Sequence, residues 1–208
     1  MILAVFGATG PTGLQLVQQA LEAGHFVRAL VRNPSRMTIT HHNLRVVMGD
    51  VLDEESCRKT LLGSQGALSC LGSRNLFRNV KVVSRGTRNI LSVMQQMGVR
   101  RLVVESAYGA GESYELAGVG MKLVIRTILA APYADKNIIE PEIKASDLDW
   151  TIVRPVALTN GPRTSKYRVG DDLRLGAGTR ISRADVAEFM LREFSERQWV
   201  QKAPSVTS

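Results

Sequence analysis

The sequence predicts an α/β fold built on a doubly wound parallel sheet. Short apolar runs typical of buried strands alternate with segments of helical spacing along most of the 208-residue chain. The first apolar run leads directly into three glycines spaced three residues apart, and an amphipathic helix follows them. Together these observations favour right-handed crossovers, with a ligand crevice at the carboxyl ends of the first and fourth strands.

The first element is a predicted strand at residues 2–6 that ends in Gly-Ala-Thr-Gly-Pro-Thr-Gly at residues 7–13. The first glycine permits a tight turn, the second lets the backbone approach a pyrophosphate, and the third lets the next helix pack closely. An isolated motif of this kind is often only a structural turn. Here a strand precedes it and a helix follows, whose exposed N–H groups suit a phosphate. The residues expected to bind a dinucleotide are Gly7, Thr9, Gly10, Pro11, Thr12 and Gly13. The hydroxyl of Thr12 is expected to reach a phosphate oxygen.

The second predicted strand, residues 26–31, follows a glycine placed to end the first helix. The chain continues as Arg-Asn-Pro-Ser-Arg at residues 32–36. Dinucleotide-binding folds that prefer NAD usually place an acid here, which binds the ribose hydroxyls. An arginine cannot accept those hydrogen bonds, but its guanidinium suits a 2′-phosphate. The residues expected to select NADP(H), unless they are ordinary loop residues, are Arg32, Ser35 and Arg36.

Later segments complete the alternation of strands and helices. Strands are predicted at residues 44–48, 67–71, 101–105 and 150–153, and helices at 56–62, 80–97 and 181–194. The last helix has Ser182 as its N-cap and Asp185 three residues later. The fold is therefore expected to be Rossmann-like, in the strand order 3-2-1-4-5-6, with a small C-terminal region on the substrate side. We expect residues 1–200 to form a single NAD(P)-binding domain and residues 201–208 to be a frayed tail.

Polar residues and glycines also follow the third and fourth strands, at the expected ligand edge of the sheet. Asp50 and Val51 are placed to meet the adenine. The residues expected beside the pyrophosphate and the nicotinamide ribose are Leu71, Gly72, Ser73 and Arg74. For Arg74 the alternative is an ordinary surface cation.

Two stretches break the alternation. Residues 107–120 are rich in glycine and follow the fifth strand, so they form either a surface loop or a lid over the substrate. Residues 161–178 are irregular, and their segments 166–169 and 172–175 are expected to pair as a small hairpin.

Bulk properties narrow the class of protein. The two cysteines, Cys57 and Cys70, provide neither a disulfide framework nor metal-ligand spacing, so we expect no metal site and a cytoplasmic location. A strand at the very start leaves no room for a signal peptide, and no apolar run is long enough to span a membrane. The net charge of +8 is dispersed, which disfavours a nucleic-acid partner. We expect a monomer or small homo-oligomer with a small-molecule partner.

Several of these motifs together resemble one family. The segments at residues 7–13, 31–36, 49–51, 71–75 and 86–90 resemble the atypical short-chain dehydrogenase/reductases, and in particular the biliverdin-IXβ reductase and flavin reductase branch. The resemblance continues through Ser106, Arg154-Pro155 and residues 182–191, so it covers nearly the whole chain. It weakens over residues 107–140, and sensors of the NmrA-like type share several of the motifs.

The resemblance implies an oxidoreductase that transfers hydride from NADPH to a flavin, a bilin or a quinone. It places Ser106 near the nicotinamide and Lys136 close to the cofactor, as the candidate catalytic residues. Pro155 and Val156 are expected to bind the cofactor, and residues 107–120 together with the segment after Pro155 are expected to form the acceptor pocket.

One absence bears on the chemistry. Most short-chain dehydrogenases use a tyrosine with a lysine four residues later to protonate a carbonyl oxygen, and no tyrosine of this chain has lysine at that spacing. Flavins and bilins spread the incoming charge over a conjugated system, so they need that acid less. Tyr133 and Lys136 remain a possible acid pair from one helical turn. The alternative function is an NmrA-like module that senses NADP(H) without turnover.

Overall fold

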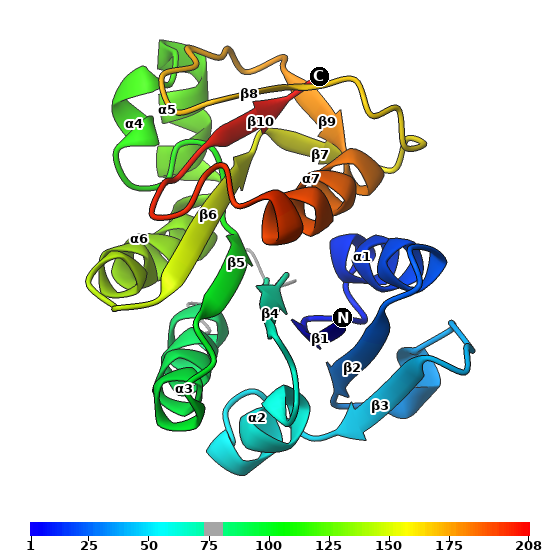
Figure 1. The fold of residues 1–208 in the computed structure, drawn as a ribbon. Coiled ribbons are helices and arrows are strands. Elements are labelled where there is room, and N and C mark those ends of the chain that lie inside the picture. Colours follow the sequence, from blue (N-terminus) through cyan, green and yellow to red (C-terminus); the bar gives the residue numbers. More distant parts are fainter. Residues whose placement is uncertain (73–80) are drawn as a thin grey trace.

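The computed structural model describes residues 1–72 and 81–208, and a mixed sheet forms its centre (Figure 1). Eight strands follow the order β3-β2-β1-β4-β5-β6-β10-β8, and β7 pairs separately with β9. The strands of the sheet are β3 (Leu44–Met48), β2 (Phe26–Val31), β1 (Ile2–Phe6), β4 (Gly66–Ser69), β5 (Arg101–Glu105), β6 (Asp149–Pro155), β10 (Ser205–Thr207) and β8 (Arg168–Gly170). The separate pair consists of β7 (Ala157–Thr159) and β9 (Arg180–Ser182).

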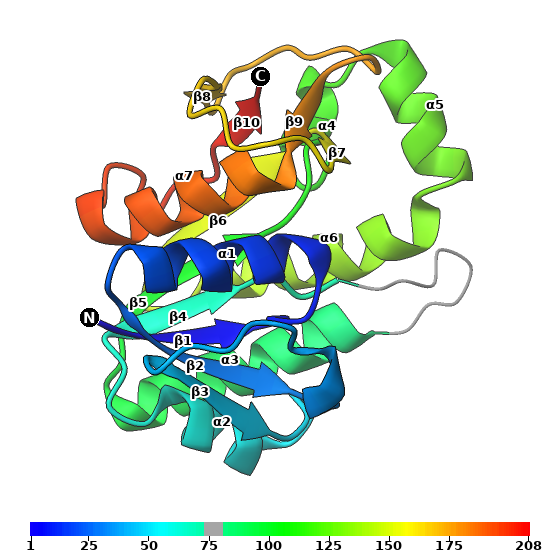
Figure 2. The same ribbon diagram turned by 90° about the vertical axis from the view of Figure 1, so that its right-hand side faces the viewer.

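Helices cover both faces of the sheet (Figure 2). One apolar layer joins the sheet to α1 (Pro11–Glu22) and α7 (Arg183–Glu196). The other joins it to α2 (Glu54–Leu61), α3 (Val82–Met97) and α6 (Ala130–Lys144). Successive residues of β1 alternate between the layers: Leu3 and Val5 face the first, and Ala4 and Phe6 the second. The shorter helices are η1 (Pro34–Arg36), α4 (Ser113–Leu116) and α5 (Val119–Thr127).

This arrangement confirms the doubly wound fold and the parallel order 3-2-1-4-5-6. Each of the five pairings between β3 and β6 is parallel, and β5 has the predicted bounds. The Ser182 hydroxyl accepts a hydrogen bond from the Asp185 N–H, which confirms the predicted cap of α7. Gly24 has φ +78° just beyond the end of α1, as expected of a residue that ends a helix.

Two expectations for the C-terminal third are wrong. Residues 201–208 are not a frayed tail, because Val206 is fully buried in β10, between Pro155 of β6 and Val169 of β8. The short strand supplies backbone partners that β6 would otherwise lack on that side. The hairpin expected within 161–178 does not form either, since residues 168–170 pair antiparallel with β10 instead.

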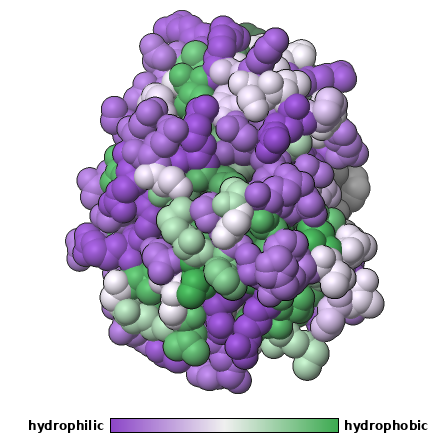
Figure 3. Space-filling view, turned by 45° about the vertical axis from the view of Figure 1, so that its right-hand side comes forward, coloured by the Kyte–Doolittle hydropathy of each residue, from purple (hydrophilic) through white to green (hydrophobic). Residues whose placement is uncertain are grey.

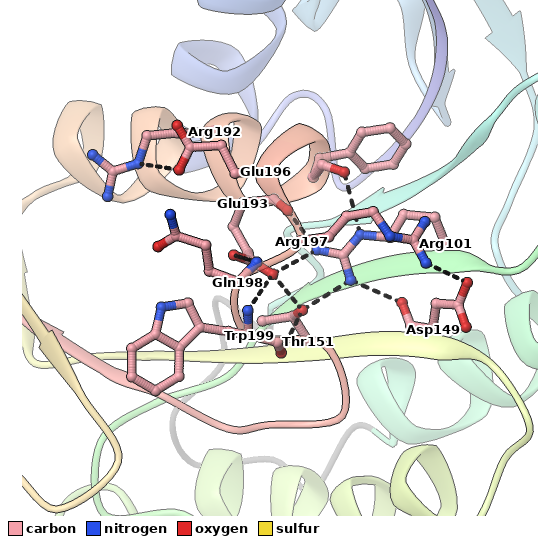
Figure 4. Close-up of polar contacts among 10 residues, drawn as sticks. Arg101, Asp149, Thr151, Arg192, Glu193, Glu196, Arg197, Gln198 and Trp199 are labelled. Carbon is pink, nitrogen blue, oxygen red and sulfur yellow. Dashed lines mark hydrogen bonds and ion pairs between the residues drawn. The ribbon is translucent and has the colours of Figure 1, made fainter.

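A buried ion pair connects the centre of the sheet to α7 (Figure 4). Arg101 at the start of β5 contacts the Glu193 carboxylate at 2.8 Å, and both side chains are almost fully buried. The same carboxylate accepts hydrogen bonds from the Thr151 hydroxyl and from the backbone N–H groups of Gln198 and Trp199. The contact therefore joins β5, β6, α7 and the segment that leads to β10.

Candidate functional site

The glycine-rich loop between β1 and α1 has no room for side chains at two positions. Gly7 has φ +73°, and a Cβ atom there would overlap the carbonyl of Cys70 at the end of β4. A Cβ atom at Gly13 would overlap the Gly7 carbonyl. The Gly10 N–H donates to the Gly7 carbonyl oxygen at 2.9 Å and closes the turn. The loop thus lies at the carboxyl ends of the neighbouring strands β1 and β4, where doubly wound folds form their ligand crevice.

The loop leads into the N-terminus of α1. Gly10 is the N-cap and has no side chain to accept from the first turn, and Pro11 has no N–H to satisfy. The N–H groups of Thr12 and Gly13 belong to the first turn, which has no intrahelical acceptor. These donors and the positive end of the helix dipole fit the diphosphate of a dinucleotide.

The Thr12 side chain departs from the expectation. Its hydroxyl donates to Glu105 Oε1 at 3.1 Å and the residue is 5 % exposed, so the hydroxyl points into the protein. Glu105 is the last residue of β5 and is itself buried. The structure thus pairs the Thr12 hydroxyl with Glu105 and leaves the Thr12 backbone N–H as the group that faces the loop, so the phosphate contact of Thr12 stays a prediction.

Glu105 is a residue that the sequence reasoning missed. Burial raises the pKa of its carboxyl, and Lys136 acts in the opposite direction. Lys136 Nζ lies 3.4 Å from the Glu105 carbonyl oxygen, and burial lowers the pKa of this lysine. The signal in the sequence was an acid at the end of a central strand whose three middle residues are apolar. It follows that Lys136 is brought to the end of β5, next to Ser106.

The Ser106 hydroxyl also points to a carboxylate. It donates to Glu140 Oε1 at 2.5 Å, and both residues are buried. Glu140, on α6, pairs in turn with Arg154 at the end of β6. The two candidate catalytic residues are thus close to one another, each beside a buried acid that the sequence analysis did not identify.

Tyr133 does not form an acid pair with Lys136. Its hydroxyl donates to the Tyr108 carbonyl oxygen at 2.7 Å, and burial raises its pKa to about 12. Lys136 points instead to the Glu105 carbonyl. The Tyr108 hydroxyl donates to the Leu173 carbonyl oxygen and accepts from the Leu175 N–H, which ties the 107–120 segment to the C-terminal region.

The candidate NADP(H)-selecting residues lie on one exposed turn after β2. Arg32 and Arg36 are exposed, and Arg36 ends η1. Asn33 Oδ1 accepts from both the Ser35 N–H at 3.1 Å and the Ser35 hydroxyl at 2.8 Å. The turn therefore places Arg32 and Arg36 just beyond the carboxyl end of β2.

The remaining candidates fall into four groups. Asp50 Oδ1 accepts from the Leu52 N–H at 3.0 Å, and Val51 is buried against Gly86. Leu71 is half-buried, Gly72 is exposed, and Thr9 is half-buried in the glycine-rich loop. Pro155 and Val156 are buried and use their backbone in the fold: Tyr108 N–H donates to the Pro155 carbonyl, and Val156 N–H to the Val206 carbonyl. Ser73 and Arg74 lie outside the described residues.

One groove lies away from the glycine-rich loop. It has a volume of about 530 Å³, lies at the amino ends of β4, β5 and β6, and is lined partly by Arg100 and Arg197. One face of the molecule shows hydrophobic residues in its middle and lower part among hydrophilic ones (Figure 3). No helix within residues 1–72 and 81–208 is long and apolar enough to cross a membrane.

Comparison with known proteins gives a family match over most of the chain. The model of a family described as NAD(P)H-binding matches residues 7–197. An uncharacterised chloroplast protein of Arabidopsis thaliana is 32 % identical over 197 residues, covering 88 % of this chain and 68 % of its own. The reductase pytE of Aspergillus terreus is 26 % identical, covering 99 % and 97 %. The structure of ChuY, named an anaerobilin reductase from Escherichia coli O157:H7, has a TM-score of 0.80 at 22 % identity, covering 99 % and 96 %.

Proposed function

This chain belongs to the NAD(P)H-binding family, and from that premise we propose that it is an NADPH-dependent reductase that transfers hydride to a conjugated acceptor, a flavin or a biliverdin-type tetrapyrrole. The observation that carries the proposal is the cradle at the end of β1. Side chains are excluded at Gly7 and Gly13, and the first turn of α1 presents its N–H groups beside them. A diphosphate fits this cradle in both shape and charge.

The preference for NADPH over NADH is supported by the turn after β2. Arg32 and Arg36 are both exposed there, where an NAD-binding protein usually has an acid. Two guanidinium groups suit a 2′-phosphate, because each provides a charged set of N–H donors.

A conjugated acceptor is supported by the two tyrosines that lie near the end of β5. The Tyr133 hydroxyl donates to the Tyr108 carbonyl, and the Tyr108 hydroxyl donates to the Leu173 carbonyl, so neither is placed to act as a phenolic acid. An alkoxide formed from a ketone would need such an acid, whereas a flavin or bilin delocalises the charge. The reductase pytE and the anaerobilin reductase are relatives or neighbours with reductase names.

When bound, NADPH supplies the hydride, and the residues of this chain position it. The amides of Thr12 and Gly13 would hold the diphosphate, and Arg32 the 2′-phosphate. Lys136 and Ser106 lie at the end of β5, on the side of the crevice where the nicotinamide half is expected. Holding the reactants close and aligned can remove about 7 kcal/mol from such a barrier at best.

The free cysteines agree with a reducing compartment. Cys57 and Cys70 are both buried thiols, and burial raises the pKa of each. We therefore propose a cytoplasmic location, while the Arabidopsis relative shows that similar proteins also occur in chloroplasts.

The test is a coenzyme-oxidation assay with NADPH and NADH against FMN, FAD, a quinone and biliverdin. Arg32→Ala is expected to raise the KM for NADPH about tenfold or more while leaving that for NADH unchanged, because a charge-assisted contact to phosphate is lost. Arg45→Ala is the matched control, since it removes an exposed arginine from β3 away from the turn.

Three outcomes would contradict the proposal or part of it. If Arg32→Ala keeps the wild-type preference for NADPH over NADH, the turn after β2 does not select the coenzyme. Binding of NADPH without turnover of any acceptor would favour the NmrA-like sensor, and no binding of either coenzyme would overturn both readings.

A further inference from the structure

The hydroxyl of Ser106 has one proton, and the structure shows where it goes. Ser106 immediately follows β5, and its Oγ lies 2.5 Å from Glu140 Oε1. Glu140 approaches from α6, and both residues are buried at 6 % and 1 % exposure. The direction of this hydrogen bond decides what Ser106 can still offer a ligand.

Glu140 acts as the acceptor because Arg154 holds it as a carboxylate. Arg154 Nε lies 3.3 Å from Glu140 Oε1, and Arg154 Nη2 contacts Oε2. Arginine is always charged and has only donors, so both carboxylate oxygens are occupied as acceptors. An ionised carboxylate has no proton to give, and the Ser106 hydroxyl must therefore donate.

The surrounding chain prevents this pair from moving away. Gly111 has φ +53°, and a Cβ atom there would overlap Arg154 Nη2 and Glu140 Oε2. The Gly111 N–H donates to Asn137 Oδ1 at 2.9 Å, and Arg154 Nη2 also contacts Glu112 at 2.7 Å. The glycine-rich 107–120 segment thus closes over the ion pair rather than standing free as a lid.

We propose that Glu140 is a positioning residue that accepts the hydrogen bond of the Ser106 hydroxyl. Ser106 then presents only its lone pairs to the crevice and accepts an N–H from the nicotinamide carboxamide. This inference rests on the proposed function. In a doubly wound sheet the diphosphate lies at the end of β1 and the adenosine half over β2, so the nicotinamide half extends toward β4 and β5. Ser106 then orients the coenzyme and does not protonate the acceptor.

Coenzyme analogues test this direction of hydrogen bonding. Thionicotinamide-adenine dinucleotide phosphate keeps the NH₂ donor, whereas the 3-acetylpyridine analogue has a methyl group in its place. By calorimetry, Ser106→Ala is expected to weaken binding of NADP⁺ and of the thio analogue about three- to tenfold, the usual value of one hydrogen bond. Binding of the acetylpyridine analogue is expected to change less than about twofold.

Three further variants complete the test. Ser146→Ala is the matched control, because its hydroxyl caps the far end of α6 by donating to the Ile143 carbonyl. Ser106→Thr keeps the hydroxyl and is expected to recover part of the NADP⁺ binding that Ser106→Ala loses. Glu140→Gln is expected to reduce the preference for NADP⁺ over the acetylpyridine analogue, because a glutamine amide can also donate to Ser106.

Each other result overturns the inference in a recognisable way. If Ser106→Ala weakens the binding of all three nucleotides equally, Ser106 does not accept a hydrogen bond from the carboxamide. If it lowers kcat with every acceptor and leaves nucleotide binding unchanged, Ser106 donates to the acceptor instead. If the wild type binds none of the nucleotides, the proposed function itself fails.

Discussion

At the scale of single residues, Glu105 connects two of the predicted site residues, Thr12 and Lys136. A carboxylate at the last position of β5 receives the Thr12 hydroxyl from the start of α1 and lies beside Lys136 from α6. Burying a charge is costly unless it is paired and hydrogen-bonded. The contact therefore fixes the glycine-rich loop to the centre of the sheet, and the loop is preorganised for its ligand.

Thr12→Val is expected to lower the free energy of unfolding by about 1–3 kcal/mol, because it removes the hydroxyl donor to the buried Glu105 carboxyl at unchanged side-chain volume. Urea denaturation measures the effect. Thr12→Ser keeps the hydroxyl and is the matched control. A loss in Thr12→Val no larger than that in Thr12→Ser, which loses only the methyl group, would contradict the role of the hydrogen bond.

Glu112 makes stability depend on acid pH. Hydrogen bonds from Lys144, then from Arg154, lower its pKa from 4.5 to about 2. An acid with a depressed folded-state pKa contributes stability above its ordinary pKa and loses it as the pH falls toward the folded value. Thermal unfolding of Glu112→Gln is thus expected to depend less on pH between about 4.5 and 2 than the wild type does. Glu115→Gln, on a more exposed acid, is the control, and parallel pH profiles would contradict the assignment.

At the scale of elements, one helix caps another. Asp135 on α6 accepts from the Val83 N–H at 3.0 Å and from the Ser84 N–H at 3.2 Å. The N-cap of α3 is Lys81, whose side chain makes no cap hydrogen bond. The cap is therefore supplied by a residue about fifty positions away, and the packing of α3 against α6 depends on it.

Asp135→Ala is expected to cost about 1–2 kcal/mol of stability, the usual value of a lost N-cap, since two N–H groups of the first turn of α3 lose their acceptor. The midpoint of urea unfolding measures it. Asp147→Ala, which removes an exposed acid near the opposite end of α6, should change the midpoint little. A midpoint for Asp135→Ala equal to that of the control would refute the capping role.

At the scale of the whole molecule, the buried Arg101–Glu193 pair holds the sheet to α7 and to the segment before β10 (Figure 4). Removing one partner of a buried pair leaves the other charge uncompensated, which typically costs about 3–5 kcal/mol. Glu193→Gln is therefore expected to unfold at a much lower urea concentration. Glu196→Gln breaks the exposed pair with Arg192 and should cost less than about 1 kcal/mol. Similar losses in both variants would contradict the structural role of the buried pair.

Much of the site was predictable, because its backbone part is local. The strand, the turn and the helix start are contiguous in residues 2–13, and each glycine there is required by a steric contact or a turn. The arginines after β2 were located in the same way, by their place at the end of a strand. The side-chain contacts could not be predicted in this way, since the direction of the Thr12 and Ser106 hydroxyls depends on partners that no local pattern identifies.

The amino-acid sequence by itself determined the order of the parallel sheet, the position of the dinucleotide cradle and the cap of α7, because these follow from periodicity, glycine stereochemistry and spacing over a few residues. Only the tertiary structure decided that Glu105 holds Thr12 across 93 positions, that Glu140 holds Ser106 across 34, and that the last residues form β10. Such contacts are made by chain segments that the fold brings together. Their partners are chosen by packing and burial rather than by neighbours in the chain.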